Sequence, residues 1–239
     1  MLDPQVLRDF TRGFYGYGDL SAKYWFVGLE EGGGTSLDEI RHRLSTWDTL
    51  GRPPLADLHE FHERAGITRW GGARPPLQST WKQLIRVVLA AEGQPADLES
   101  IRTYQRDLLG RRNGKTALIE LMPLPSPSTA EWLYGSGGLE IISDRASYSA
   151  AILDERIAAI RDLIAVRRPR IVVFYGLNRR SVWSSIAGCV LVDSDAGPFA
   201  FHSTPSTLFL MTRHPVAWGA KNVEFEAAGR FVRRFDREA

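Results

Sequence analysis

The sequence predicts an α/β fold, a three-layer α/β/α sandwich around a central four-stranded, mostly parallel sheet. Two observations lead to this prediction. Four short apolar runs lack strict alternation of apolar and polar residues, which is typical of parallel strands covered by helices on both faces. Segments with helical periodicity separate these runs, and strands that alternate with helices form layered α/β domains.

The four expected strands span residues 24–29, 117–122, 171–175 and 208–212, and the expected helices span residues 77–91, 150–166 and 223–235. The first helix is expected to be capped by Ser79 and to stop at Gly93. Residues 35–76, which hold three of the five histidines, are expected to form a helical insertion after the first strand. We expect residues 1–239 to form a single domain that carries this insertion.

The composition is that of an ordinary globular protein, with 239 residues, 44% hydrophobic and 24% charged. The apolar runs are much shorter than a membrane span, and the N-terminal stretch MLDPQVLRDF lacks the apolar core of a signal peptide. We therefore expect a cytoplasmic protein with no membrane partner. The single cysteine, Cys189, rules out an internal disulfide and a cysteine-based metal or iron–sulfur site, so we expect no metal and no cofactor.

The formal net charge of +2 neither demands nor excludes nucleic acid as a partner. The distribution of charge is more informative, because residues 156–180 hold seven arginines and one acidic residue, Asp162. A solvated helix face is the expected place for most of these arginines. Arg179 and Arg180 follow a strand end, where they are candidates for contact with a phosphate backbone.

A polar or glycine-rich segment follows each of the four expected strands. Active sites of open parallel sheets gather at the carboxyl ends of the strands, so we expect the functional site in these segments. The glycines at 32–34 do not predict a phosphate loop, because no lysine follows them and two glutamates precede them. The segments read GLEEGGG (28–34), MPLPSPS (122–128), YGLNRR (175–180) and TRHPVAWG (212–219).

The order and spacing of these motifs resemble the uracil-DNA glycosylase superfamily. The matching stretches are GLEEG (28–32), TALIELMPLPSPS (116–128), RIVVFYG (170–176), TRHPVAWG (212–219) and the final helix KNVEFEAAGRFVRRF (221–235). The resemblance covers most of the chain apart from the insertion at 35–76. It implies a monofunctional DNA glycosylase that acts as a monomer on DNA, flips a base out of the helix and leaves an abasic site.

Cleavage of the bond between base and deoxyribose develops positive charge on the sugar and negative charge on the base, so it needs an anion and a hydrogen-bond donor. The resemblance implies that Glu30 positions the attacking water, with Glu31 as the second candidate. A family subgroup carries its glutamate one position earlier, where this chain has Leu29. One of the two glutamates could instead cap the following helix. His214 matches the family histidine that donates to the base carbonyl.

The resemblance also implies how DNA is held. A residue that follows the His-Pro pair fills the gap left by the flipped base, and Trp218 is large enough to do so, although a buried core position is the ordinary place for a tryptophan. Loops rich in proline and serine pinch the DNA backbone. The residues assigned to DNA contact are Pro125, Ser126, Ser128, Arg179, Arg180, Arg213 and Trp218.

Two departures from the family predict a base larger than uracil. Uracil-specific members place an aromatic residue where this chain has glycines 32–34, and they read uracil through an Asn where this chain has Ala117, with Asn113 as a substitute if the register shifts. A bulky modified pyrimidine, such as the hypermodified bases of some phage genomes, fits this pattern, and the insertion could close over the extra group. The residues assigned to substrate binding are Gly28, Gly32, Gly33, Ala117, Asn113 and Trp70.

Other functions stay open at this point. The same fold could act as a uracil repair glycosylase, as a DNA-binding module without catalysis, or on free nucleosides, because similar carboxylate chemistry serves any N-glycosidic bond. A metal-dependent phosphoesterase lacks a compact ligand motif and is the least favoured. Its ligands would be Glu30, Glu31, Asp193, Asp195 and His214.

Overall fold

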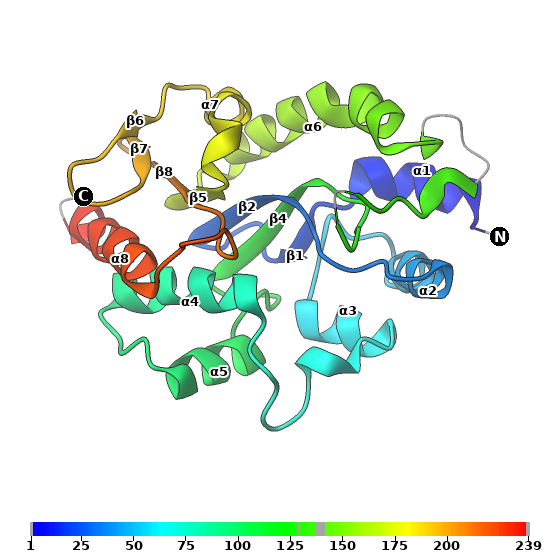
Figure 1. Cartoon of the computed structure of the whole chain (residues 1–239), viewed down its shortest axis with the longest axis horizontal. Coiled ribbons are helices and arrows are strands. Elements are labelled where there is room, and N and C mark those ends of the chain that lie inside the picture. The colour runs from blue at the N-terminus through cyan, green and yellow to red at the C-terminus, as the bar shows by residue number, and fades with distance from the viewer. Residues whose placement is uncertain (1, 129, 137–141, 238–239) are drawn as a thin grey trace.

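The computed structural model describes residues 2–128, 130–136 and 142–237. It has the predicted α/β architecture, with one mostly parallel sheet between helical layers (Figure 1). The sheet is wider than predicted, because it has eight strands in the order β3-β1-β4-β2-β5-β8-β7-β6 instead of four.

The four predicted strands form the centre of the sheet, and their predicted bounds hold to within one residue. They are β4 (Thr116–Met122), β2 (Tyr24–Glu30), β5 (Ile171–Tyr175) and β8 (Leu208–Thr212). These strands lie side by side in that order and all pair in parallel. Every residue of β4, β5 and β8 is buried, as expected for strands covered on both faces. Their carboxyl ends therefore meet at one edge of the sheet.

The four additional strands are β1 (Gly16–Gly18), β3 (Leu55–Ala56), β6 (Val192–Asp193) and β7 (Ala200–Ser203). Each has two to four residues, which is too short for an apolar pattern to identify. β1 pairs antiparallel with β4 and parallel with β3, while β7 pairs antiparallel with β8 and β6. They extend the parallel centre on both sides.

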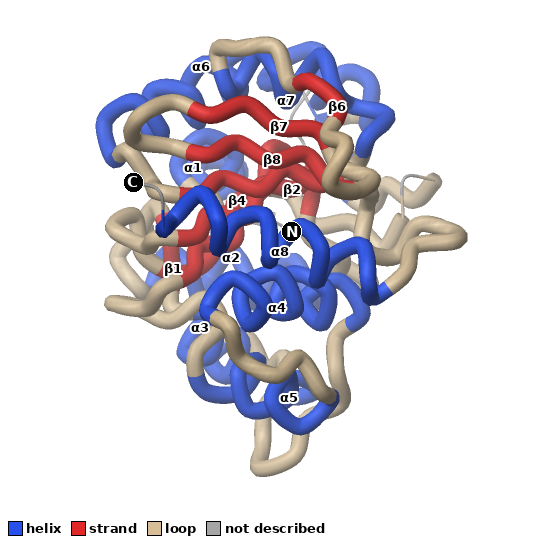
Figure 2. Tube along the Cα trace, turned by 90° about the vertical axis from the view of Figure 1, so that its left-hand side faces the viewer, coloured by secondary structure: helices blue, strands red, loops and turns tan. Residues whose placement is uncertain are grey.

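Helices cover both faces of the sheet. Helices α6 (Arg145–Arg167) and α7 (Arg180–Ala187) lie on one face, whereas α4 (Ser79–Glu92) and α8 (Asn222–Arg237) lie on the other, with α5 (Leu98–Asp107) beyond α4 (Figures 1 and 2). The three predicted helices correspond to α4, α6 and α8. The predicted cap of α4 is wrong by one residue, because the Gln78 side chain accepts the Trp81 backbone N–H at 2.7 Å and Ser79 is already helical. Gly93 ends α4 in the left-handed conformation as predicted.

The insertion at 35–76 is largely helical, as predicted. It contains α2 (Leu37–Thr49), β3, α3 (Leu58–Arg64) and the short helix η1 (Thr68–Trp70). Aromatic packing attaches it to α1 (Pro4–Gly13) and to Phe14, which follows that helix. The ring centroids of Trp47 and Phe10 lie 5.2 Å apart, and those of Phe61 and Phe14 lie 5.7 Å apart. The pairing of β3 with β1 anchors the insertion to the sheet as well.

Two further short helices complete the described elements, η2 (Tyr134–Ser136) and η4 (Leu177–Arg179). None of the helices formed by the described residues combines the length and the apolarity that crossing a membrane requires.

Candidate functional site

A cavity of about 740 Å³ opens at the carboxyl ends of the parallel strands. Residues that follow β2, β4, β5 and β8 all line it, together with Trp70 of the insertion and Trp81 of α4. The cavity therefore lies where the parallel topology predicts a site.

Glu30 lies at the end of β2 in the cavity wall, with 10% of its side chain exposed. Its Oε2 accepts a hydrogen bond from Nη1 of Arg145 at 2.6 Å. Nη2 of the same arginine donates to Ser126 Oγ at 2.6 Å and to the Ser128 carbonyl at 2.9 Å, which ties Glu30 to the Pro-rich loop. Among the described residues, no side chain or backbone group donates to the other oxygen of Glu30, Oε1, so this oxygen is available to a water or a substrate.

Arg145 is a site residue that the sequence reasoning missed. It is the first residue of α6, where its positive charge is repelled by the positive end of the helix dipole, so a cation there is unfavourable. An arginine at this position, directly after the N-cap Asp144, is a sequence signal that it serves a contact outside the helix.

Glu31 is held by protein groups on both of its oxygens. Oε2 accepts the Tyr17 hydroxyl at 2.8 Å and Nη1 of Arg43 at 3.0 Å, and Nε2 of His62 lies 3.6 Å from Oε1. Burial alone would raise the pKa of Glu31, but Arg43, His62 and Tyr17 outweigh it and hold the pKa at about 2. Glu31 therefore links the insertion to the end of β2 as a permanent anion.

Neither glutamate caps the following helix, so that alternative is wrong. Helix α2 begins at Leu37, and the side chain of Ser36 accepts the backbone N–H of Glu39 at 3.1 Å.

His214 lines the cavity just after β8. Its ring centroid lies 5.5 Å from that of Tyr175, and the two rings are arranged edge to face. The backbone N–H of Val216 donates to Nδ1 of His214 at 3.4 Å. Burial lowers the pKa of His214, so the imidazole is neutral and carries its hydrogen on Nε2. This nitrogen can then donate to an acceptor in the cavity.

The glycines after β2 have different roles. Gly32 lines the cavity, and a Cβ atom there would meet no atom within 4 Å. Gly34 has a φ of +65°, and a Cβ atom there would lie 2.6 Å from the Pro125 carbonyl oxygen. The backbone conformation and the close approach of Pro125 therefore require glycine at this position. A Cβ atom on Gly33 would lie 2.6 Å from Nη2 of Arg43. Within β2 itself, a Cβ atom on Gly28 would lie 2.0 Å from the Tyr175 hydroxyl. Of Gly28, Gly32, Gly33 and Gly34, Gly32 is the one that lines the cavity and adds space to it.

Ala117 and Asn113 lie away from this cavity. Ala117 pairs with Trp25 near the amino end of β4, and Asn113 precedes that strand and lines a separate cavity of about 510 Å³. The residue of β4 that lines the site is Glu120, which the sequence reasoning missed. The signal was a single charged residue inside the otherwise apolar run ALIELM.

The residues assigned to DNA contact are divided by the structure. The cavity is lined by Ser126, Ser128, Arg179 and Arg213. Pro125 is buried outside the lining, and its carbonyl accepts the Tyr134 hydroxyl at 2.9 Å. Two of the arginines have acidic partners. Arg213 lies 3.3 Å from Glu224, and Arg180 is outside the cavity lining in an ion pair with Asp193.

Trp218 is 98% exposed, so its alternative placement in the core is wrong. It lies on the loop after His214, and the apolar side chains of Val216 and Leu177 are also exposed beside the cavity that both residues line. Trp218 itself is outside the cavity lining, and exposed apolar side chains that gather near a cavity are typical of a surface that binds another molecule.

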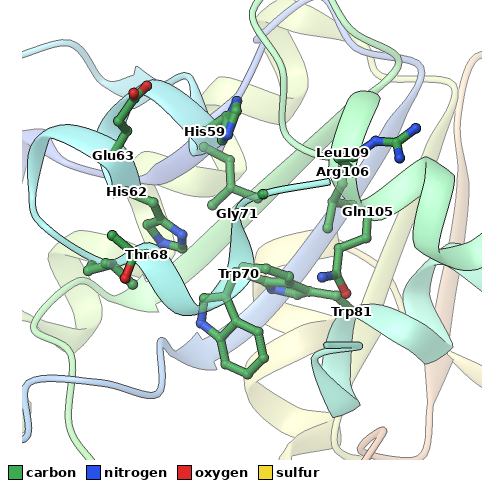
Figure 3. A pocket seen from close by; sticks show the side chains of 13 residues that line it. His59, His62, Glu63, Thr68, Trp70, Gly71, Trp81, Gln105, Arg106 and Leu109 are labelled. Atoms are coloured by element: carbon green, nitrogen blue, oxygen red, sulfur yellow. The ribbon is translucent and has the colours of Figure 1, made fainter. Parts of the chain in front are cut away.

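A second cavity of about 190 Å³ lies between the insertion and helices α4 and α5 (Figure 3). Trp70 and Trp81 line both cavities, and their ring centroids are 5.8 Å apart. His62 stacks on Trp81 at 5.8 Å, and His59 and Thr68 add polar groups. The insertion thus builds a smaller, aromatic-walled space beside the main cavity.

The ligand set of the phosphoesterase alternative is not assembled. The part of the chain that the structure describes contains no group of three or more His, Cys, Asp or Glu side chains arranged to hold a metal ion. Asp193 is instead paired with Arg180.

Comparison with known proteins assigns no family, because neither a protein-family model nor a curated protein matches the chain. A functional interpretation therefore depends on the geometry of the cavity and on the motifs that surround it.

Proposed function

We propose that this protein is a DNA glycosylase that hydrolyses the N-glycosidic bond of a flipped, bulky modified pyrimidine and leaves an abasic site. The observation that carries the proposal is the gathering of Glu30, His214 and the exposed loop of Trp218 around one cavity at the carboxyl ends of the parallel strands. The motif resemblance to uracil-DNA glycosylases supports the same chemistry.

Glu30 acts on the sugar side. As the bond between C1′ and the base nitrogen breaks, its electron pair leaves with the base and the sugar becomes positive. The carboxylate of Glu30 stabilises that charge, and its Oε1 accepts a proton from the water that adds to C1′. The contact with Arg145 at 2.6 Å fixes the orientation of the carboxylate.

His214 acts on the base side. Its Nε2–H donates to a carbonyl of the departing base, where negative charge accumulates. The lowered pKa of the half-buried imidazole supports a neutral donor, and the Val216 N–H fixes the ring through Nδ1.

The surface around the cavity favours DNA over free nucleosides as the substrate. The exposed Trp218, two residues after Val216 of the cavity wall, would have no partner on a nucleoside, whereas it can fill the gap that a flipped base leaves in a duplex. Arg179, at the cavity, supplies a cation for the DNA backbone.

The size of the site supports a base that carries an extra group. A cavity of about 740 Å³ falls in the range of pockets that enclose ligands larger than a single ring. The open position at Gly32 and the adjacent space between Trp70 and Trp81 supply further room on the insertion side.

The test is incubation with duplexes that contain uracil, 5-hydroxymethylcytosine, glucosylated cytosine or another modified pyrimidine, followed by detection of abasic sites. We expect release of a bulky modified base by the parent protein, loss of release in Glu30→Gln, and no change in Glu155→Gln, a control in which the glutamate pairs with Arg12 at the surface.

Three outcomes would contradict the proposal. Release of uracil alone would indicate a repair glycosylase with a plain substrate. Turnover of nucleosides without DNA would indicate a nucleoside hydrolase. DNA binding without release from any duplex would indicate a binding module.

A further inference from the structure

Glu120 is a buried acid that the mechanism above does not use. It lies in β4 beside Gly28 of β2, lines the main cavity, and is 7% exposed. Its backbone is fully engaged, because its N–H donates to the Tyr15 carbonyl at 2.8 Å and its carbonyl accepts from Arg156 at 2.8 Å. Its carboxyl group is different: among the described residues, Oε2 is buried without any hydrogen-bond partner.

A buried polar group without a partner is costly, so it calls for a bound water, ion or ligand as its partner, or for a role in a reaction. The neighbouring arginine does not relieve this cost, because the guanidinium of Arg156 donates to the backbone carbonyls of Leu121, Glu120 and Arg12. The described contacts therefore include no ion pair with Glu120, and a partner for its carboxyl group has to come from the cavity that Glu120 lines.

The surroundings of Glu120 keep it neutral. Burial raises the pKa of the Glu120 carboxyl well above its usual value, and the negative charges of Glu31 and Glu30 raise it further. A neutral carboxyl group presents one O–H donor and one carbonyl acceptor side by side. The charged and titratable groups that face it are Glu30 and Glu31 of β2, Tyr17 of β1, Tyr175 of β5 and Arg156 of α6.

We propose that Glu120 reads the base as a neutral carboxylic acid and selects a cytosine-type edge, in which a ring nitrogen acceptor lies beside an exocyclic amino group. The O–H of Glu120 donates to the ring nitrogen and its carbonyl accepts from the amino group. This inference rests on the proposed glycosylase function and deepens it by naming the class of base.

The charge of the cavity favours this edge over that of uracil. A neutral acid could also pair with the N–H and carbonyl of a uracil-type edge. Arg43, Arg179 and Arg213 also line the cavity. At Glu120 itself, however, the negative charges of Glu31 and Glu30 outweigh the positive charge of Arg156, so this part of the cavity attracts an amino group and repels a carbonyl oxygen.

The test compares the parent with Glu120→Gln and Glu120→Ala in single-turnover base release. Matched duplexes carry cytosine-type and uracil-type bases with the same substituent on C5. The amide of Gln keeps one donor and one acceptor, so we expect Glu120→Gln to stay close to the parent rate on cytosine-type bases. We expect Glu120→Ala to lose about 10–100-fold, the usual effect of losing a bidentate base contact.

A pH profile separates this role from a merely structural one. The parent rate should fall as alkaline pH removes the proton from Glu120, whereas the rate of Glu120→Gln should lack that alkaline limb. Thermal unfolding of all three proteins controls for folding, and the comparison of parent with Glu120→Gln decides the question if the Ala variant does not fold.

The outcomes separate this inference from the proposed function. A parent that releases no base from any duplex overturns the proposed function. If the parent is active, two results with the variants overturn the Glu120 inference: a rate of base release by Glu120→Gln as low as that of Glu120→Ala, or a rate of Glu120→Ala equal to that of the parent. Persistence of the alkaline limb in Glu120→Gln also overturns it. So does release of uracil-type bases as fast as cytosine-type bases.

Discussion

Replacement of Glu31 by Gln should destabilise the protein in a pH-dependent way. The carboxylate is 13% exposed and accepts hydrogen bonds from Tyr17 and Arg43, with His62 at 3.6 Å. Its pKa falls from 4.5 to about 2 on folding, because Arg43, His62 and Tyr17 outweigh the opposing effect of burial. At about 1.4 kcal/mol for each pH unit, the ionised Glu31 contributes about 3 kcal/mol to the free energy of unfolding.

The sign of the pH dependence follows from the lowered pKa. The contribution of Glu31 is fully present above pH 4.5, where the unfolded chain is also ionised, and it is lost as pH falls toward about 2. Urea unfolding followed by tryptophan fluorescence should therefore give a large gap between parent and Glu31→Gln at neutral pH, and the gap should narrow below pH 4.5.

The control for this measurement is Glu63→Gln, in the same insertion, where the side chain is exposed. We expect a change within about 0.5 kcal/mol for that variant, as for most surface substitutions. Two results would contradict this role of Glu31. One is equal stability of Glu31→Gln and the parent at neutral pH, and the other is a difference in the free energy of unfolding that stays constant as the solution is acidified.

Three further predictions concern the rim and floor of the cavity. Trp218→Ala should leave the free energy of unfolding within about 0.5 kcal/mol of the parent, because the side chain is exposed. It should slow base release from duplex DNA more than from single strands, and kinetics on both substrates would check this. Gly34→Ala should cost at least about 1 kcal/mol by thermal unfolding because of its positive φ and its contact with Pro125, whereas Gly32→Ala should leave stability unchanged. Arg145→Gln should lower the rate of base release about 10–100-fold, because Glu30 loses its orienting partner, and unchanged single-turnover kinetics would contradict that role.

The centre of the sheet was predictable because parallel strands buried on both faces produce continuous apolar runs. Residues 171–175 and 208–212 matched their strands without error. The edge strands β3 and β6 were not predictable, because two residues carry no periodic signal and their pairing depends on tertiary contacts.

The site was predictable in place and less so in its members. Parallel topology located Glu30 and His214 at one edge because each follows a strand. The hydrogen bonds from Tyr17 and Arg43 to Glu31 could not be predicted from the sequence, because Arg43 reaches Glu31 only when the insertion folds back against β2. Glu120 was overlooked because the base contact was expected at Ala117, near the amino end of β4, whereas Glu120 lies near the carboxyl end of that strand.

The proposed role of Glu30 is the hydrolysis of an N-glycosidic bond in DNA. The most direct measurement is mass spectrometric detection of the free base released from a duplex that contains a bulky modified pyrimidine, for the parent, Glu30→Gln and Glu31→Gln under single-turnover conditions at neutral pH. With the parent we expect a free base and an intact strand that breaks only after alkali. We expect no free base with Glu30→Gln and continued release by any folded Glu31→Gln. Release by Glu30→Gln at the parent rate would contradict the proposed role.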